Sequence, residues 1–389
     1  MVRFKDIFDK YINNQATEKE IDYVENEIDK IEIINDYLAN KIEDEIIIND
    51  YNQGFDYDKS SSVIEESDNT VKEIKKAINK KLVQVGVISA LSVACFLLCL
   101  RFIVSPIMNK IYYNPLEKVD GYSSRMDIDL EIFSELHFPG VSNVQVSYEP
   151  LGFGKYDINI RQQDYIDVDN VGYSAVLNKN QFQADNGFYK YLPMNVFTRG
   201  TSPFYQYPVD ADTEDMEKLK SLPDYIGAKV MVSFKEDLDV KEILDTLDGF
   251  DLDNNWIGVR SFPLDEQSAP LTGFVPNGTG LVFDEQYFDS EKYPYFDLGW
   301  VDFDKGKITP EILETHFESM LRYMADNEDF VKTDVMFKGC DSFYKEALEY
   351  IKSNGIKSYG VVVSGKPSEI LKLRQHPMVE QIYVEDVFL

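Results

Sequence analysis

The stretch LVQVGVISALSVACFLLCLRFIV, residues 82–104, decides how this chain is organised. Residues 82–100 carry no charge, and Arg101 is the only charged residue in the run. As a helix the run spans about 34 Å, enough for a bilayer core, and a long side chain near its end can reach the headgroups. The alternatives are a buried core helix, rarely apolar on every side at this length, and a signal peptide, which would not follow 81 mostly polar residues. We predict one transmembrane helix over residues 82–104.

Basic residues gather on the N-terminal side of this run: Lys72, Lys75, Lys76, Lys80 and Lys81. The C-terminal flank offers Arg101, Lys110 and Lys118, more sparsely placed. The positive-inside rule therefore puts the N-terminus in the cytoplasm and the C-terminal domain outside a cell membrane crossed once. The predicted parts are a helical region (1–50), a linker with the basic flank (51–81), the membrane helix (82–104), a β-rich subdomain (105–210) and an α+β domain (211–389).

The net charge and the residue counts of the chain exclude several classes of function. A net charge of −30 argues against direct binding of nucleic acid, which needs clustered Lys and Arg. That charge either serves solubility or forms an acidic surface for a basic partner. With three scattered His and no Cys-x-x-Cys, we expect neither a metal site nor a cofactor. No nucleophile–base set is present, so we expect no enzyme.

The first 50 residues predict two amphipathic helices that form a hairpin. Helical spacing puts one set of apolar side chains on a short first helix: Phe4, Ile7, Phe8, Tyr11 and Ile12. Thr17 and Glu20 have the spacing of a capping box that opens a second helix. Its apolar stripe consists of Ile21, Val24, Ile28, Ile31, Ile34 and Leu38. So short a region cannot bury both stripes fully, which leaves weak self-association or docking onto a partner as the two interpretations.

The region after the membrane helix predicts an α+β fold. Alternating runs favour antiparallel strands with one wet face: IDLEIF (128–133), VQVSYE (144–149), YDINIRQQ (156–163) and YSAVLN (173–178). A β-α-β pattern then occurs twice, over 228–261 and 358–389, as a ferredoxin-like sandwich requires. Between the repeats lie two predicted helices, 308–327 and 342–354, as inserted helices. An aromatic stretch, 274–303, fits either a ligand groove or the edge of a core.

Two parts of the chain resemble membrane-bound anti-sigma factors of Gram-positive bacteria. Residues 4–44 show the short helix, polar gap, capped acidic helix and closing Tyr37-Leu38 of that family's N-terminus. Because no Cys or His precedes Cys95, the chain resembles the zinc-free branch. Residues 227–261 and 359–389 resemble the two ends of the family's C-terminal sigma-regulator domain, most clearly at Val232-Ser233-Phe234, Trp256 and the final V-E-D-V.

The resemblance implies a function. Residues 1–50 would hold an extracytoplasmic-function sigma factor at the membrane through the apolar residues of both helices and Tyr37. The outer domain would sense an envelope signal, or bind a second membrane protein or envelope ligand, and trigger release. The alternative is a membrane-anchored envelope binding or scaffold protein whose outer domain holds a glycan, a peptide or a partner protein.

Overall fold

A computed structural model of the chain describes residues 7, 10–11, 15–27, 30, 61–119, 123–164, 171–189, 197, 211–263, 270–278, 289–299, 301, 308–333 and 342–389. The chain divides into two units, residues 1–92 and 93–389. The predicted N-terminal hairpin lies largely outside the described residues, although residues 18–27 are helical. The second unit combines α-helices with two antiparallel sheets, as the α+β prediction required.

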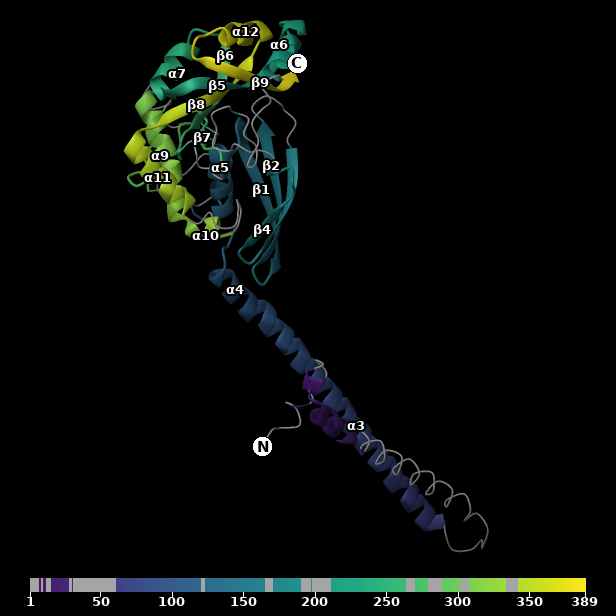
Figure 1. The fold of residues 1–389 in the computed structure, drawn as a ribbon. Helices are drawn as coiled ribbons and strands as arrows, with labels where there is room; N and C mark the ends of the chain where they lie inside the picture. The colour runs from purple at the N-terminus through teal and green to yellow at the C-terminus, as the bar shows by residue number, and fades with distance from the viewer. Residues whose placement is uncertain are drawn as a thin grey trace. The chain divides into compact units, whose positions relative to one another are not determined.

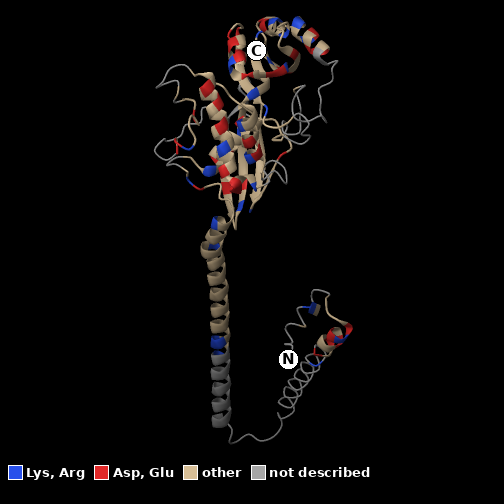
Figure 2. Cartoon of the chain, turned by 60° about the vertical axis from the view of Figure 1, so that its left-hand side comes forward, with Lys and Arg blue, Asp and Glu red and all other residues tan. Residues whose placement is uncertain are grey.

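One long helical stretch contains the predicted membrane segment. It consists of α3 (Ser61–Cys99), a π-helical turn η1 (Leu100–Val104) and α4 (Ser105–Ile111). Residues 79–111 are long and apolar enough to cross a bilayer, and most of this helix is coloured as uncharged in Figure 2. None of the most apolar window is buried. The helix does not end at Ser105-Pro106, where the sequence analysis ended the apolar run. Proline has no N–H to donate and crowds the carbonyl four residues earlier, and the wider π turn directly before it accommodates both effects.

The first sheet is a meander in the order β1-β2-β3-β4. Its strands are β1 (Val141–Gly152), β2 (Lys155–Asp164), β3 (Val171–Asn178) and β4 (Gln181–Ala184), all paired antiparallel. Side chains of β3 alternate between exposed and covered positions, because one sheet face packs on the core and the other meets solvent. Three of the four alternating runs were therefore correctly predicted as strands.

The fourth run, IDLEIF, was wrongly predicted as a strand. It belongs to the helix α5 (Arg125–His137), which lies between the four-stranded sheet and the helix α9 (Pro310–Asp326) (Figure 1). Eleven of its 13 residues are buried, including Asp129, Glu131 and Glu135. Since α5 is covered on all sides, its polar residues do not collect on one wet face. The period-2 pattern instead reflects buried carboxylates that each have a hydrogen-bond partner.

The second sheet has the order β7-β6-β8-β5-β9, and every pairing in it is antiparallel. Its strands are β5 (Gly227–Asp239), β6 (Leu252–Val259), β7 (Gly273–Phe274), β8 (Lys357–Gly365) and β9 (Val379–Phe388). Both predicted β-α-β units are present, as β5-α7-β6 with α7 (Val240–Leu247) and as β8-α12-β9 with α12 (Pro367–Arg374). The strands of the two β-α-β units interleave in the sheet, because β8 lies between β5 and β6.

The remaining helices are α6 (Ala211–Ser221), α9, α10 (Glu328–Val331) and α11 (Phe343–Asn354). α9 and α11 are the two helices predicted between the repeats. One hydrophobic cluster joins α5, both sheets and these helices. The described part of the aromatic stretch belongs to that core, with Phe274, Tyr293 and Phe296 all buried. The predicted boundary at residue 210 stays a prediction.

Candidate functional site

Few of the predicted sigma-factor-binding residues lie among the described residues. Phe4, Phe8, Ile12, Ile28, Ile31, Ile34, Tyr37 and Leu38 lie outside them. Ile7, Tyr11 and Ile21 are half-buried, and Val24 is fully buried. Val24 is thus already covered within this chain.

The start of the second N-terminal helix is held by Glu20. Its carboxylate accepts hydrogen bonds from the backbone N–H of Thr17, at 2.9 Å, and from the Thr17 hydroxyl, at 2.8 Å. Lys10 donates to the same carboxylate at 2.8 Å. Together these contacts, with Lys10 first, lower the pKa of Glu20 to about 2. The carboxylate reaches back as in a capping box, but the hydroxyl donates to it instead of accepting from the backbone.

The predicted membrane-flanking lysines, Lys72, Lys75, Lys76, Lys80 and Lys81, all fall within α3. Arg101 lies at the other end of the apolar run, in η1. Its side chain lies against the β1–β2 turn, since a Cβ atom at Gly152 would stand 2.9 Å from Arg101 Nη1. Arg101 therefore contacts folded protein at the level where the sequence analysis expected it to reach the headgroups.

Three further contacts fix the C-terminal end of the membrane helix to the first sheet. The Ser105 hydroxyl accepts from the backbone N–H of Phe153, and the Asn109 amide oxygen accepts from that of Gly154, both at 3.0 Å. Just past the helix, the backbone N–H of Tyr113 donates to Asn180 Oδ1 at 3.0 Å. The helix end is thus hydrogen-bonded to the β1–β2 turn and to the β3–β4 turn.

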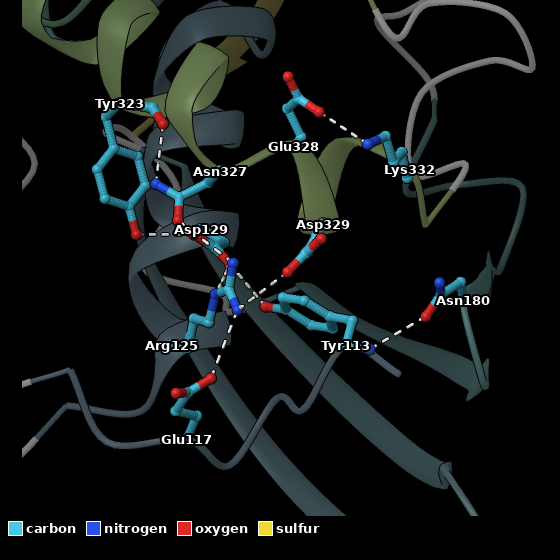
Figure 3. Close-up of polar contacts among 10 residues, drawn as sticks. All are labelled: Tyr113, Glu117, Arg125, Asp129, Asn180, Tyr323, Asn327, Glu328, Asp329 and Lys332. Carbon is cyan, nitrogen blue, oxygen red and sulfur yellow. Dashed lines mark hydrogen bonds and ion pairs between the residues drawn. The ribbon is translucent and has the colours of Figure 1, made fainter. Parts of the chain in front are cut away.

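Beyond this junction the chain enters a buried polar cluster centred on Asp129 (Figure 3). The Tyr113 hydroxyl donates to Asp129 Oδ2, and the Tyr323 hydroxyl donates to Asp129 Oδ1, both at 2.7 Å. The Arg125 Nε atom lies 3.7 Å from Asp129 Oδ2, and the guanidinium stacks over the Tyr113 ring at 5.1 Å. One carboxylate thereby joins the segment after the membrane helix to both α5 and α9.

The periphery of this cluster reaches solvent through Arg125. Its guanidinium forms ion pairs with Glu117 at 3.4 Å and with Asp329 at 3.9 Å, and donates to Asn327 Oδ1 at 3.4 Å. Burial raises the pKa of Asp129 to about 6, although the Tyr113 hydrogen bond and the Arg125 charge act in the opposite direction. Asp129 is therefore a fully buried carboxyl whose pKa lies above the ordinary value of an aspartate.

A second buried polar cluster lies at the other end of α5. Glu135 Oε1 accepts from the backbone N–H of Val275 and lies 3.0 Å from His316 Nε2. His316 Nδ1 lies 2.7 Å from the Tyr295 carbonyl. Both ring nitrogens of His316 therefore face oxygen atoms of other elements. The arrangement ties α5 to α9 and to Val275, the residue directly after the strand β7.

His137 ends α5 in a different environment. Its Nδ1 atom lies 2.7 Å from the Leu271 carbonyl, and its Nε2 atom lies 2.9 Å from the Tyr344 hydroxyl. A neutral ring protonated at Nδ1 satisfies both contacts. Burial lowers the pKa of His137 to about 4.

These two clusters position and connect elements; they do not present reactive groups to a ligand. Among the described residues, no three His, Cys, Asp or Glu side chains gather as a metal site. None of these α5 residues was predicted as part of a site from the sequence, and residues 128–133 were predicted as a strand. The available signal was Ser124-Arg-Met-Asp127, whose capping box opens α5.

The comparisons with known proteins concern the second sheet. Residues 219–386 match the family model described as sigma factor regulator C-terminal. The match runs from the end of α6 into β9; it covers the other four strands of the second sheet in full, together with α9 and α11. It supports membership of an anti-sigma regulator family. No curated protein and no solved structure matches the chain.

Proposed function

We propose that this chain is an anti-sigma factor that holds an extracytoplasmic-function sigma factor at the membrane and releases it when the outer domain receives an envelope signal. In this proposal residues 1–50 bind the sigma factor in the cytoplasm. The apolar run of residues 82–104, within the helix of residues 79–111, crosses the membrane once, and residues 105–389 lie outside. The chain acts by binding and not as an enzyme, in a Gram-positive bacterium and without zinc.

The observation that carries the proposal is the match of residues 219–386 to the sigma factor regulator C-terminal family. A helix able to cross a bilayer precedes the matched region in the same chain. Residues 1–70 hold 19 acidic against 7 basic residues, a net charge of −12. Such an acidic segment complements the basic DNA-binding surface of a sigma factor and favours fast, specific association. The strand order β6-β8-β5-β9 also supports the ferredoxin-like assignment of the second sheet.

Contacts at the junction provide a route for the signal. Ser105 and Asn109 hold the β1–β2 turn, while Tyr113 reaches the buried carboxylate of Asp129. Asp129 also binds Tyr323, which belongs to the region matched by the family model. A rearrangement of α5 therefore reaches the membrane helix through Asp129 and Tyr113, and Tyr323 adds a contact from α9. Two distinct states of this cluster are what such coupling requires.

The experiment is co-purification of the tagged full-length chain from host membranes, with bound proteins quantified by mass spectrometry. We expect a sigma factor at near-stoichiometric yield. The variant Ile28→Glu/Ile31→Glu puts charge into the predicted docking stripe and should lose the sigma factor. Asn26→Glu is the matched control, because it adds negative charge at an exposed position of the same predicted helix.

The outcomes separate the two functions under consideration. Loss of the sigma factor with the stripe variant and retention with Asn26→Glu support the proposal. Retention with both variants means that the predicted stripe is not the binding face. Recovery of envelope proteins without any sigma factor favours the scaffold interpretation and contradicts the proposal.

A further inference from the structure

The tip of the β1–β2 hairpin has an unusual composition for an exposed turn. Residues 151–154 read Leu-Gly-Phe-Gly, with Leu151 41% exposed and Phe153 39% exposed. The backbone of Phe153 is left-handed, with φ of 56°, between two glycines that are also left-handed. Glycine or asparagine adopts this conformation with less strain than phenylalanine. A bulky apolar side chain at such a position points to a role for the side chain itself.

The tip lies beside the membrane helix at a defined level. It contacts the helix through Arg101, Ser105 and Asn109, which are four residues apart and therefore share one face. The opposite face carries Ile103, Ile107 and Ile111, which are 53–68% exposed. One face of the helix therefore holds the tip, and over the same length the opposite face is apolar and exposed.

The position of the tip along the helix axis corresponds to the lipid interface. A hydrocarbon core of about 30 Å takes about 20 helical residues, which places its far boundary near Arg101 when counted from Leu82. Ser105 and Asn109 then lie roughly 6 and 12 Å beyond that boundary, within and just above the headgroup layer. Tilting of the helix brings both residues closer to the core.

The charge around the tip fits an anionic surface. The segments 101–118, 150–155 and 178–181 hold five basic residues and one acidic residue, Glu117, in a chain of net charge −30. The basic residues are Arg101, Lys110, Lys118, Lys155 and Lys179. The Gly154 carbonyl accepts from the backbone N–H of Lys179 at 2.6 Å, so the β3–β4 turn lies against the tip. The Lys179 ammonium group stacks over the Tyr112 ring at 5.8 Å.

We propose that the β1–β2 tip is a lipid-contacting surface, which inserts Leu151 and Phe153 into the headgroup layer while Lys155 and Lys179 bind anionic lipid headgroups. The surface is continuous with the membrane helix and lies at the C-terminal end of the span, whichever way the chain is oriented. Apolar side chains flanked by lysines are the usual composition of interfacial anchors. The outer domain is then held by lipid as well as by its own helix. The inference rests on the membrane span and not on the sigma-factor proposal, so the two can fail separately.

The test uses the full-length variant Phe153→Trp in vesicles of phosphatidylglycerol and phosphatidylcholine. Some of the phosphatidylcholine is brominated near the top of its acyl chains. The unsubstituted chain, which contains two tryptophans, provides the background to be subtracted. Tyr225→Trp is the control, since Tyr225 is 75% exposed in the turn between α6 and β5.

We expect loss of the added fluorescence with brominated lipid and protection from aqueous acrylamide for Phe153→Trp, and the reverse for Tyr225→Trp. When Lys155→Gln and Lys179→Gln are combined with Phe153→Trp, the lipid quenching in anionic vesicles should weaken. Unchanged quenching would exclude the two lysines as headgroup ligands. Quenching of Phe153→Trp by acrylamide alone would show a tip in water, and insensitivity to both quenchers would show a tip covered by protein. Either result overturns the proposal.

Discussion

The hydroxyl group of Tyr113 lies 2.7 Å from Oδ2 of Asp129, although Asp129 is fully buried and Tyr113 is only two residues past the end of the membrane helix. The other oxygen of the same carboxylate accepts from Tyr323, at the same distance. One side chain of α5 therefore binds two tyrosines that come from separate parts of the chain. This symmetry allows the stability of the cluster to be separated from its connection to the membrane helix.

Removing either tyrosine hydroxyl should cost the same stability. Tyr113→Phe and Tyr323→Phe each delete one hydrogen bond to the Asp129 carboxylate, so we expect a loss of about 1–3 kcal/mol in the free energy of unfolding for each. Denaturant unfolding of the full-length protein in detergent, followed by tryptophan fluorescence, measures this. A loss confined to one variant would contradict the shared role of the carboxylate.

The same pair separates stability from signalling. If the proposed function holds, Tyr113→Phe should change the activity of a sigma-dependent reporter in response to the inducing condition. Tyr323→Phe, of equal stability, should change it less, because it leaves the link to the helix in place. Equal responses from both variants would indicate that only the stability of the outer domain matters.

Asp129 should make the unit of residues 93–389 more stable in mild acid. Burial raises the pKa of Asp129 to about 6 in the folded protein, from 3.8. The folded state thus binds the proton more tightly, and its contribution is fully present below pH 3.8 and lost as pH rises through about 6. We expect the stability of the unsubstituted protein relative to Asp129→Asn to rise as pH falls from 7.5 to 4.5, by at most roughly 3 kcal/mol for a shift of about two pKa units. A difference that does not change with pH would show that Asp129 does not titrate in this range.

His137 should make the protein less stable as pH falls, which is the opposite of the effect of Asp129. Burial lowers its pKa to about 4 from 6.5, so its contribution is present above pH 6.5 and is lost as pH falls through about 4. We expect His137→Gln to lose less stability on acidification than the unsubstituted protein. Asp129 and His137 stand two helical turns apart, roughly 12 Å, so the double variant should show the sum of the two effects. A clearly non-additive double variant would indicate that the two groups titrate as one coupled system.

The sequence predicted most elements after residue 140 because local signals agreed with the tertiary environment. The N-cap of the helix α7 is Asp239, whose capping box with Glu242 was available from the sequence. Strands β5 and β8 are apolar runs bounded by polar turns, as expected for strands covered on both faces. In each case the hydrophobic pattern and the end signals pointed to the same element.

α5 could not be recognised from its periodicity, since the pattern there is set by distant residues. Asp129 is paired with Tyr113 and Tyr323, and Glu135 with His316, at sequence separations of up to 194 residues. No local rule connects a buried carboxylate with a tyrosine so far along the chain. The contact between Arg101 and Gly152 was missed for the same reason.

The junction itself predicts local protection that depends on single side chains. Asn109 Oδ1 accepts from the backbone N–H of Gly154, so Asn109→Ala should speed hydrogen exchange at Gly154, with little change in the strands β2 and β3. Ser105→Ala should do the same at Phe153, whose N–H donates to the Ser105 hydroxyl. Lys110→Ala is the matched control, because Lys110 is exposed on the same helix. Exchange measured by mass spectrometry on the full-length protein in detergent reports each peptide separately. If Asn109→Ala leaves the tip as protected as Lys110→Ala does, the turn is held by its own backbone and the membrane helix is not fixed to it. If protection is lost at the tip alone, the side chains of Ser105 and Asn109 fix the helix end to the domain that follows it.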